Sequence, residues 1–212
     1  KINWEYHSYR NSDIDKFTES INWLLSKDVF IIRTGKTAEK RLKTKTKNIL
    51  DYPFCEKKND MLDIWFFANA DLVISSAAGI DEVSAAYKIP RIYINLLPIV
   101  DTPSWSESLT ISKHLYWKET NKHLTFEEYI NLKRMNHTND FKKKGIIIES
   151  LTNKNIKSIT IDGWNYFIEK KPIKEKDLMQ TNKFKKLILS EEHLKKLHKN
   201  INNKWILSSN LF

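Results

Sequence analysis

The residues best suited to binding chemistry form a run of small side chains in the middle of the sequence: Ser75, Ser76, Ala77, Ala78 and Gly79. Short side chains let backbone N–H groups approach an oxyanion, and a helix that begins beside them points its positive end at the same place. Two carboxylates follow, Asp81 and Glu82, which can cap that helix or accept hydrogen bonds from sugar hydroxyls. The run therefore predicts a phosphate site, although an ordinary strand-to-helix turn that binds nothing has the same composition.

The elements around this run should place it at the edge of a sheet. The apolar residues 72–74 predict a strand, the spacing of Ile80, Val83, Ala86 and Tyr87 predicts a helix with these residues on one face, and residues 91–95 predict a second strand. A strand, helix and strand in this order form a βαβ unit with a parallel sheet. Ligands of such sheets bind outside the carboxyl ends of the strands, where residues 75–79 fall.

Arg33 and Gly35 follow another apolar run, residues 29–32, which we expect to form a buried strand. The sequence Gly35-Lys36-Thr37 is similar to the end of a nucleotide-triphosphatase loop, but Phe30 stands where that motif requires a glycine. We therefore exclude that motif. Arg33 and Gly35 are instead expected at the same sheet edge as the small residues, or Arg33 makes only a surface ion pair.

The other predicted elements surround this unit. Ser12 and Asp15 form a capping pair that predicts a helix as far as Lys27, and Asp60–Asn69 predicts a helix whose aromatic stripe lies in the core. Further strands are expected at 48–52, 110–117 and 145–150, the last one buried, and further helices at 125–135 and 153–170. Residues 96–108 should form a long ordered loop over the sheet edge, where loops often close over ligands.

Composition limits the classes of function. The chain has 212 residues, 41% of them hydrophobic, and a formal net charge of +10. The excess is mostly lysine scattered along the chain, which favours a solvated basic surface over a nucleic-acid site. The histidine spacing predicts no metal site, and the absence of a long apolar run predicts no membrane span. The single cysteine excludes an internal disulfide and is compatible with the cytoplasm.

Several segments resemble, in the same order, a group of bacterial glycosyltransferases from surface-polysaccharide clusters. They are YHSYRNSDIDKF (6–17), VFIIRTGK (29–36), ILDYP (49–53), DLVISSAAGIDEVSAAYKIPRIYIN (71–95), LTISKHLYW (109–117) and LTFEEYI (124–130). The resemblance covers roughly residues 6–151, and the ordered set is more specific than any one segment. The turn SSAAGIDE is also similar to the donor-binding turn of nucleotide-sugar epimerases.

This resemblance implies a fold and an architecture. Residues 1–170 would form an α/β, Rossmann-like nucleotide-sugar-binding domain, with a parallel sheet and flanking helices, that lacks its first strand. Residues 171–212 would be a helical C-terminal tail packed on the domain. The whole would be the C-terminal, donor-binding half of a GT-B glycosyltransferase, whose N-terminal acceptor half and catalytic base are missing, so that the chain is incomplete as an enzyme.

The resemblance also assigns roles. Residues 75–79 would hold the diphosphate of a nucleotide sugar, Asp81 or Glu82 would bind ribose or sugar hydroxyls, and catalytic Arg33 would neutralise the leaving diphosphate, with Gly35 beside it. Arg10 and Asn11 would make a second contact, to an anionic group or to a sugar. No metal or cofactor would be needed.

The acceptor would be a polysaccharide or glycolipid, as in lipopolysaccharide synthesis, and the protein would be cytoplasmic with peripheral contact at the inner membrane face. Three alternatives stay open: an epimerase-like domain, a basic nucleic-acid-binding domain, and a Rossmann-like domain that serves only assembly.

Overall fold

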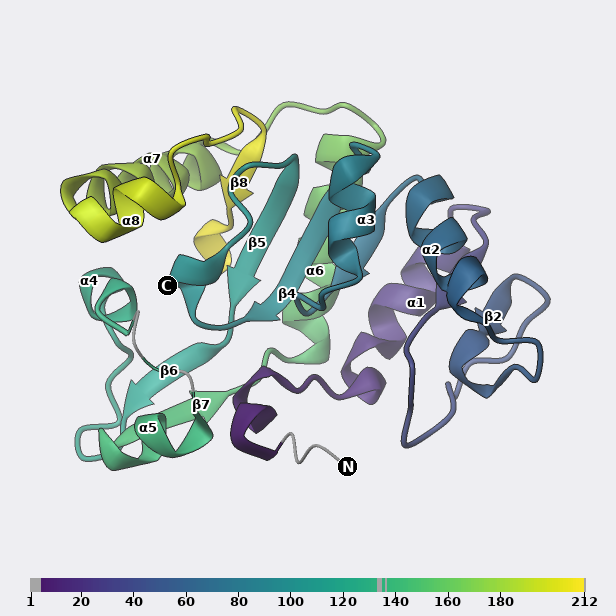
Figure 1. Ribbon diagram of the computed structural model, residues 1–212, viewed down its shortest axis with the longest axis horizontal. Helices are drawn as coiled ribbons and strands as arrows, with labels where there is room; N and C mark the ends of the chain where they lie inside the picture. The colour runs from purple at the N-terminus through teal and green to yellow at the C-terminus, as the bar shows by residue number, and fades with distance from the viewer. Residues whose placement is uncertain (1–4, 133–134, 136, 212) are drawn as a thin grey trace.

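A parallel four-stranded sheet forms the centre of the molecule. The computed structural model describes residues 5–132, 135 and 137–211, and Figure 1 shows their arrangement. The strands lie in the order β3 (Val73–Ser75), β4 (Arg91–Leu96), β5 (Ser108–Ser112) and β8 (Trp205–Leu207), and every neighbouring pair is parallel. The protein is thus an α/β protein with a parallel sheet and flanking helices, which confirms the predicted fold class at this level and is consistent with a Rossmann-like domain.

The βαβ unit is present where the sequence predicts it. The helix α3 (Asp81–Ala86) connects β3 to β4. β4 is buried along its whole length, and because side chains alternate in a strand, Ile92 and Ile94 face one side of the sheet while Tyr93 faces the other. The face of the helix differs from the prediction: Ala86 and Tyr87 are exposed, and the buried residues of α3 are Asp81 and Ser84.

Two hydrophobic clusters cover the two faces of the sheet. Helix α6 (Asn153–Phe167) packs on β4 and β5, and lies behind the sheet in Figure 1. The cluster on this face includes Ile92, Leu109, Ile156 and Ile206. The opposite cluster includes residues of α4 (Phe126–Ile130), α7 (Glu175–Ser190) and α8 (Glu192–Leu197), among them Phe126, Phe184, Ile188 and Leu194. Trp205 and Leu207 join this second cluster, as the alternation in β8 requires.

The C-terminal segment is more than a helical tail. α7 and α8 are present, but β8 pairs with β5 and forms an edge of the central sheet. The prediction of a helical tail at residues 171–212 is therefore incomplete, because three buried residues, Trp205, Ile206 and Leu207, continue the sheet. A domain boundary at residue 170 stays a prediction.

Two small sheets flank the centre. β1 (Ile31–Arg33) and β2 (Ile49–Asp51) form a parallel pair, while β6 (His114–Trp117) and β7 (Ile146–Glu149) form an antiparallel pair. The predicted extended segment 110–117 is thus divided between β5 and β6. The strand at 145–150 exists but is not fully buried, since Ile147 on β7 is 43% exposed.

The remaining helices are η1 (Glu5–Arg10), η2 (Ile14–Phe17), α1 (Thr18–Leu25), η3 (Tyr52–Phe54), α2 (Asp60–Asn69), η4 (Ile99–Asp101), α5 (Thr138–Lys143) and η5 (Ser209–Leu211). The predicted cap at Ser12 is wrong: Asp13 caps η2 by accepting a hydrogen bond from the Asp15 amide, and Ser12 Oγ accepts one from Asn95 instead. None of the helices within the described ranges combines the length and apolar content that crossing a bilayer requires.

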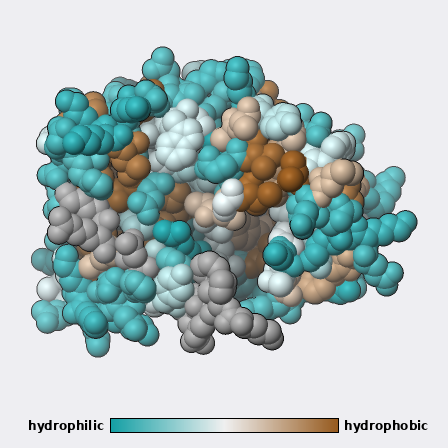
Figure 2. Space-filling view, viewed as in Figure 1, coloured by the Kyte–Doolittle hydropathy of each residue, from teal (hydrophilic) through white to brown (hydrophobic). Residues whose placement is uncertain are grey.

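Helix α2 has the predicted bounds but not the predicted burial. Met61, Ile64 and Trp65 are 76%, 50% and 55% exposed, whereas Phe67 is buried. Most of the stripe expected in the core therefore faces outward. In the view of Figure 2, hydrophilic residues cover much of the surface and hydrophobic ones gather over the neighbouring α3.

Candidate functional site

A cleft of about 290 Å³ lies at the carboxyl ends of β3 and β4. Six residues singled out in the sequence line it: Arg10, Ala77, Ala78, Gly79, Asp81 and Glu82. The other lining residues are Tyr93, Leu96, Leu97, Asp101, Pro103 and Trp105. The fold therefore brings Arg10, in η1, together with the turn at residues 77–79 and the loop that follows β4.

The small-residue turn is held by hydrogen bonds from its own side chains. Ser75 Oγ donates to Asp81 Oδ2 at 2.6 Å, and the Ala78 amide donates to the same oxygen at 2.8 Å. The Ala77 amide donates to Ser75 Oγ at 3.1 Å, with Ala77 in the left-handed region at φ 64°. Two amides expected to face a diphosphate are thus satisfied within the protein, and α3, with six residues, is too short to add much dipole.

The floor of the cleft contains buried polar atoms without partners. Asp81 and Tyr93 are each 1% exposed, and within the described part of the chain neither Asp81 Oδ1 nor the Tyr93 hydroxyl has a hydrogen-bond partner. Because buried polar groups are nearly always hydrogen-bonded, these atoms are candidates for contact with a ligand.

A buried arginine supports this floor. Arg91 is fully buried, donates from Nη1 to the backbone oxygen of Asp81 at 3.2 Å, and lies with its guanidinium carbon 5.4 Å from the centre of the Tyr93 ring. Burial raises the pKa of Asp81, and the hydrogen bonds from Ser75 and the Ala78 amide, followed by the charge of Arg91, partly oppose that increase. The guanidinium thus favours the ionised form of the carboxyl that lines the cleft.

The wall of the cleft carries an exposed cation and an exposed aromatic ring. Arg10 Nη2 lies 3.5 Å from Asp101 Oδ2, and Arg10 Nε donates to the Tyr9 hydroxyl at 3.0 Å. The side chains of Arg10 and Asp101 are 40% and 46% exposed, so their ion pair is solvated and its members can turn toward a ligand. Trp105 is 43% exposed and offers a flat apolar surface to a base or a sugar.

The other predicted site residues do not line this cleft. Arg33 Nη1 donates to Asp51 Oδ1 at 3.1 Å and to the Lys40 carbonyl at 2.8 Å, which ties β1 to β2 and to the loop between these two strands. Gly35 has φ 145°, a conformation that favours glycine, which accounts for the residue type without a ligand. Ser75 stabilises the turn through its hydrogen bond to Asp81 and does not line the cleft. Ser76 and Asn11 do not line it either.

Sequence reasoning missed six residues that line the cleft, and three of them carry a polar or aromatic side chain: Tyr93, Asp101 and Trp105. The alternation of β4 could have indicated Tyr93, since Ile92 and Ile94 mark the face opposite to it. The loop at 96–108 was expected over the sheet edge, and Asp101 and Trp105 belong to it. The sequence did not show which loop side chains turn inward.

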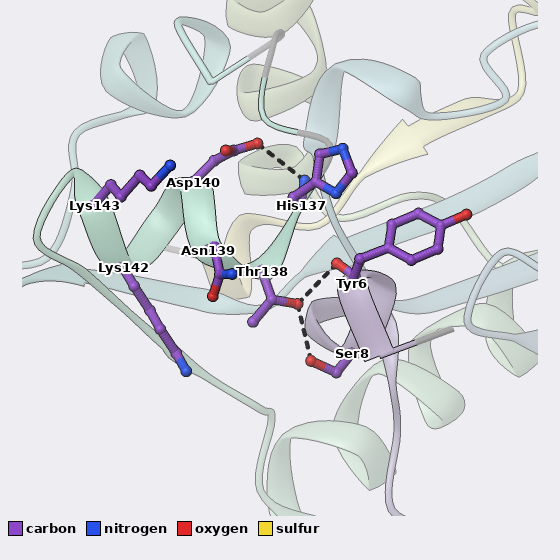
Figure 3. A pocket seen from close by; sticks show the side chains of 8 residues that line it. All are labelled: Tyr6, Ser8, His137, Thr138, Asn139, Asp140, Lys142 and Lys143. Atoms are coloured by element: carbon purple, nitrogen blue, oxygen red, sulfur yellow. Dashed lines mark hydrogen bonds between the residues drawn. The ribbon is translucent and has the colours of Figure 1, made fainter. Parts of the chain in front are cut away.

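A larger cavity, of about 670 Å³, lies between η1 and α5. Figure 3 shows its lining: Tyr6, Ser8, His137, Thr138, Asn139, Asp140, Lys142 and Lys143. Thr138 Oγ1 donates to the Tyr6 carbonyl at 3.0 Å, lies 2.9 Å from Ser8 Oγ and accepts from the Tyr9 amide at 3.1 Å. These contacts join η1 to α5, and the cavity contains no site residue predicted from the sequence.

Metal ligation has no visible basis in the described residues, where no three His, Cys, Asp or Glu side chains come together in an arrangement suited to an ion. Comparisons with protein-family models, curated proteins and solved structures found no match to the chain. The resemblance to polysaccharide glycosyltransferases therefore stays a prediction from the sequence.

Proposed function

We propose that this chain binds a nucleoside diphosphate sugar in the cleft at the ends of β3 and β4, as the donor-binding half of a GT-B glycosyltransferase. The observation that carries the proposal is the convergence of Arg10, Trp105, Asp81 and Tyr93 on one cleft at the carboxyl edge of a parallel sheet. Ligands of open α/β sheets bind at this edge. A nucleotide sugar presents a flat base, an anionic diphosphate and hydroxyls, and the cleft offers a complementary group for each.

The roles follow from the geometry. Trp105 packs against the base or a sugar face, Arg10 turns from Asp101 to the diphosphate, and the unpartnered oxygens of Asp81 and Tyr93 meet hydroxyls at the floor. Arg10 therefore replaces Arg33 as the cation proposed to stabilise the leaving diphosphate, since Arg33 is engaged with Asp51.

The transfer reaction itself needs more than this cleft. The proposed acceptor is a polysaccharide or glycolipid, held by an acceptor half that would close over the sheet edge and supply the catalytic base. An acceptor on a lipid carrier would bring the enzyme to the surface of the inner membrane.

Calorimetric titration of the protein with UDP, GDP and CDP at moderate salt tests the proposal. Saturable binding of at least one nucleotide is expected, with a loss of about tenfold or more in both Arg10→Ala and Trp105→Ala. Arg41→Ala is the matched control, because Arg41 lies over Phe54, away from the cleft, and should bind as wild type does. Arg33→Ala removes the cation that the sequence analysis expected at the diphosphate. Its nucleotide affinity should equal that of wild type if Arg10 has this role instead.

Two results would contradict the proposal. One is the absence of saturable binding by a protein shown to be folded. The other is binding that both cleft variants leave unchanged. An affinity for oligonucleotides that falls steeply with salt would instead favour the nucleic-acid-binding alternative.

A further inference from the structure

Residues 6–12 form a strap that runs from α5 to the edge of the central sheet. At its first end the strap is fixed by Thr138, whose hydroxyl contacts the carbonyl of Tyr6, the hydroxyl of Ser8 and the amide of Tyr9 (Figure 3). Residues 6–9 are thus hydrogen-bonded to α5 through the Thr138 side chain, and the Tyr9 ring also packs against Phe141 of the same helix, with ring centres 5.3 Å apart.

At its second end the strap is fixed by two buried polar side chains of the sheet. Lys113, directly after β5, donates from Nζ to the Asn11 carbonyl at 2.7 Å. Asn95, in β4, donates from Nδ2 to Ser12 Oγ at 3.1 Å and accepts from the Leu151 amide at 3.0 Å. Lys113 and Asn95 are 3% and 2% exposed, so the two side chains that hold the strap are themselves buried, although both hydrogen bonds are only partly buried.

Arg10 is the residue between the two anchors, and it lines the cleft. A lysine ammonium is costly to bury, and here the hydrogen bond it makes goes to the strap. We propose that Thr138, Lys113 and Asn95 are positioning residues, which hold the strap at both ends so that Arg10 meets the anionic part of a ligand without further ordering of the backbone. The inference rests on the proposed function, because Arg10 needs an anion in the cleft.

The physical reason is preorganisation. An arginine on a free segment loses backbone and side-chain freedom when it binds, and that loss reduces affinity. An arginine on an anchored segment has lost the backbone part already. The anchors should therefore raise affinity only through Arg10, and their effect should vanish when the guanidinium is absent.

A double-mutant cycle separates this role from a general effect on the fold. The affinity for UDP, GDP and CDP is measured by calorimetry for wild type, Thr138→Val and Lys113→Met, and for each variant combined with Arg10→Ala. Thr138→Val keeps the shape of the side chain, and Lys113→Met removes a buried charge, so both variants should fold. Lys118→Met is the matched control, since Lys118 is an exposed lysine five residues further on.

The expected result is a loss of about tenfold in each anchor variant and a change within about twofold when Arg10 is already alanine. Lys118→Met should bind as wild type does. Equal losses with and without Arg10, or no loss in either anchor variant, would overturn the positioning role while nucleotide binding, and with it the proposed function, stands. If the folded wild-type protein binds none of the three nucleotides, the proposed function fails first and the positioning role fails with it.

Discussion

Ser75 and Asp81 are joined by a hydrogen bond of 2.6 Å from Oγ to Oδ2, which folds the turn after β3 back onto the first residue of α3. The same hydroxyl accepts from the Ala77 amide and the same carboxylate oxygen from the Ala78 amide. The pair therefore supplies acceptors that this turn would otherwise need from water or from a ligand.

The Ser75–Asp81 pair predicts the effect of a small substitution. Ser75→Ala should lower the free energy of unfolding by about 1–3 kcal/mol, because it removes one of the two donors to Asp81 Oδ2 and leaves the Ala77 amide without its acceptor. Urea denaturation checks this value. Ser76→Ala makes the same chemical change one residue later, outside the pair, and should have a smaller effect. Equal effects of the two changes would show that the pair does not stabilise the turn.

Lys113 predicts a dependence of stability on pH. Burial lowers its pKa from 10.5 to about 8, so between these values the unfolded chain binds a proton that the folded protein does not. Stability from this group therefore rises as the pH rises through that window, and the penalty for burying the charge is complete below about pH 8.

The measurement for Lys113 is the difference between wild type and Lys113→Met, since other groups titrate in the same range. From about pH 7.5 to about pH 9.5, the free energy of unfolding of wild type relative to the variant should increase by about 2 kcal/mol. A difference that stays constant over this range would mean that Lys113 keeps an ordinary pKa in the folded protein.

Gly163 predicts a packing defect. A Cβ atom at this position of α6 would lie 2.2 Å from Ile92 Cδ1 in the middle of β4. Gly163→Ala should therefore cost about 1–3 kcal/mol of stability, because the fully buried Ile92 side chain or the helix must shift to admit the methyl group. Gly79→Ala is the control, since its Cβ meets nothing within 4 Å. Thermal unfolding of both variants makes the comparison, and a neutral Gly163→Ala would disprove the close contact.

Trp205 tests whether the C-terminal segment belongs to the same cooperative unit as the sheet. It is 1% exposed, its ring centre lies 5.2 Å from that of Phe184, and its indole N–H donates to Thr102. Trp205→Ala should cost about 3–5 kcal/mol and keep a single unfolding transition. Trp65→Ala, which removes a tryptophan that is 55% exposed, should have little effect. Two separate transitions would favour a detachable tail.

Caps and apolar periodicity in the sequence predicted the elements that depend on contacts between residues close in the chain. The bounds of α2 agree with the sequence because the side chain of Asn59 caps the helix by accepting from the Leu62 amide, and Thr125 and Glu128 form the expected capping box of α4. The βαβ unit was predictable for the same reason, since an apolar run, a tight turn and a helical period follow one another in the sequence.

The features that the sequence did not reveal depend on contacts between residues far apart in the chain. Ser12 does not cap a helix because its hydroxyl accepts a hydrogen bond from Asn95, which lies in a strand much later in the chain. β8 has only three residues among polar neighbours, so its pairing with β5 leaves little periodic signal. In the cleft, the small-residue run was recognisable, but the inward direction of Tyr93 and Trp105 depends on the register of β4 and the path of the loop after it.

The position of β8 at the edge of the sheet also affects how the chain can fold during synthesis. β3, β4 and β5 leave the ribosome before β8, and Trp205 contacts Thr102 across a sequence separation of 103 residues. Until β8 arrives, the outer edge of β5 has no strand beside it and the apolar face around Phe184 lacks one of its largest side chains. Contacts of this separation form slowly, and an open strand edge is a template for pairing with another chain. Pairing of this edge with another nascent chain is therefore favoured in the interval before β8 is made.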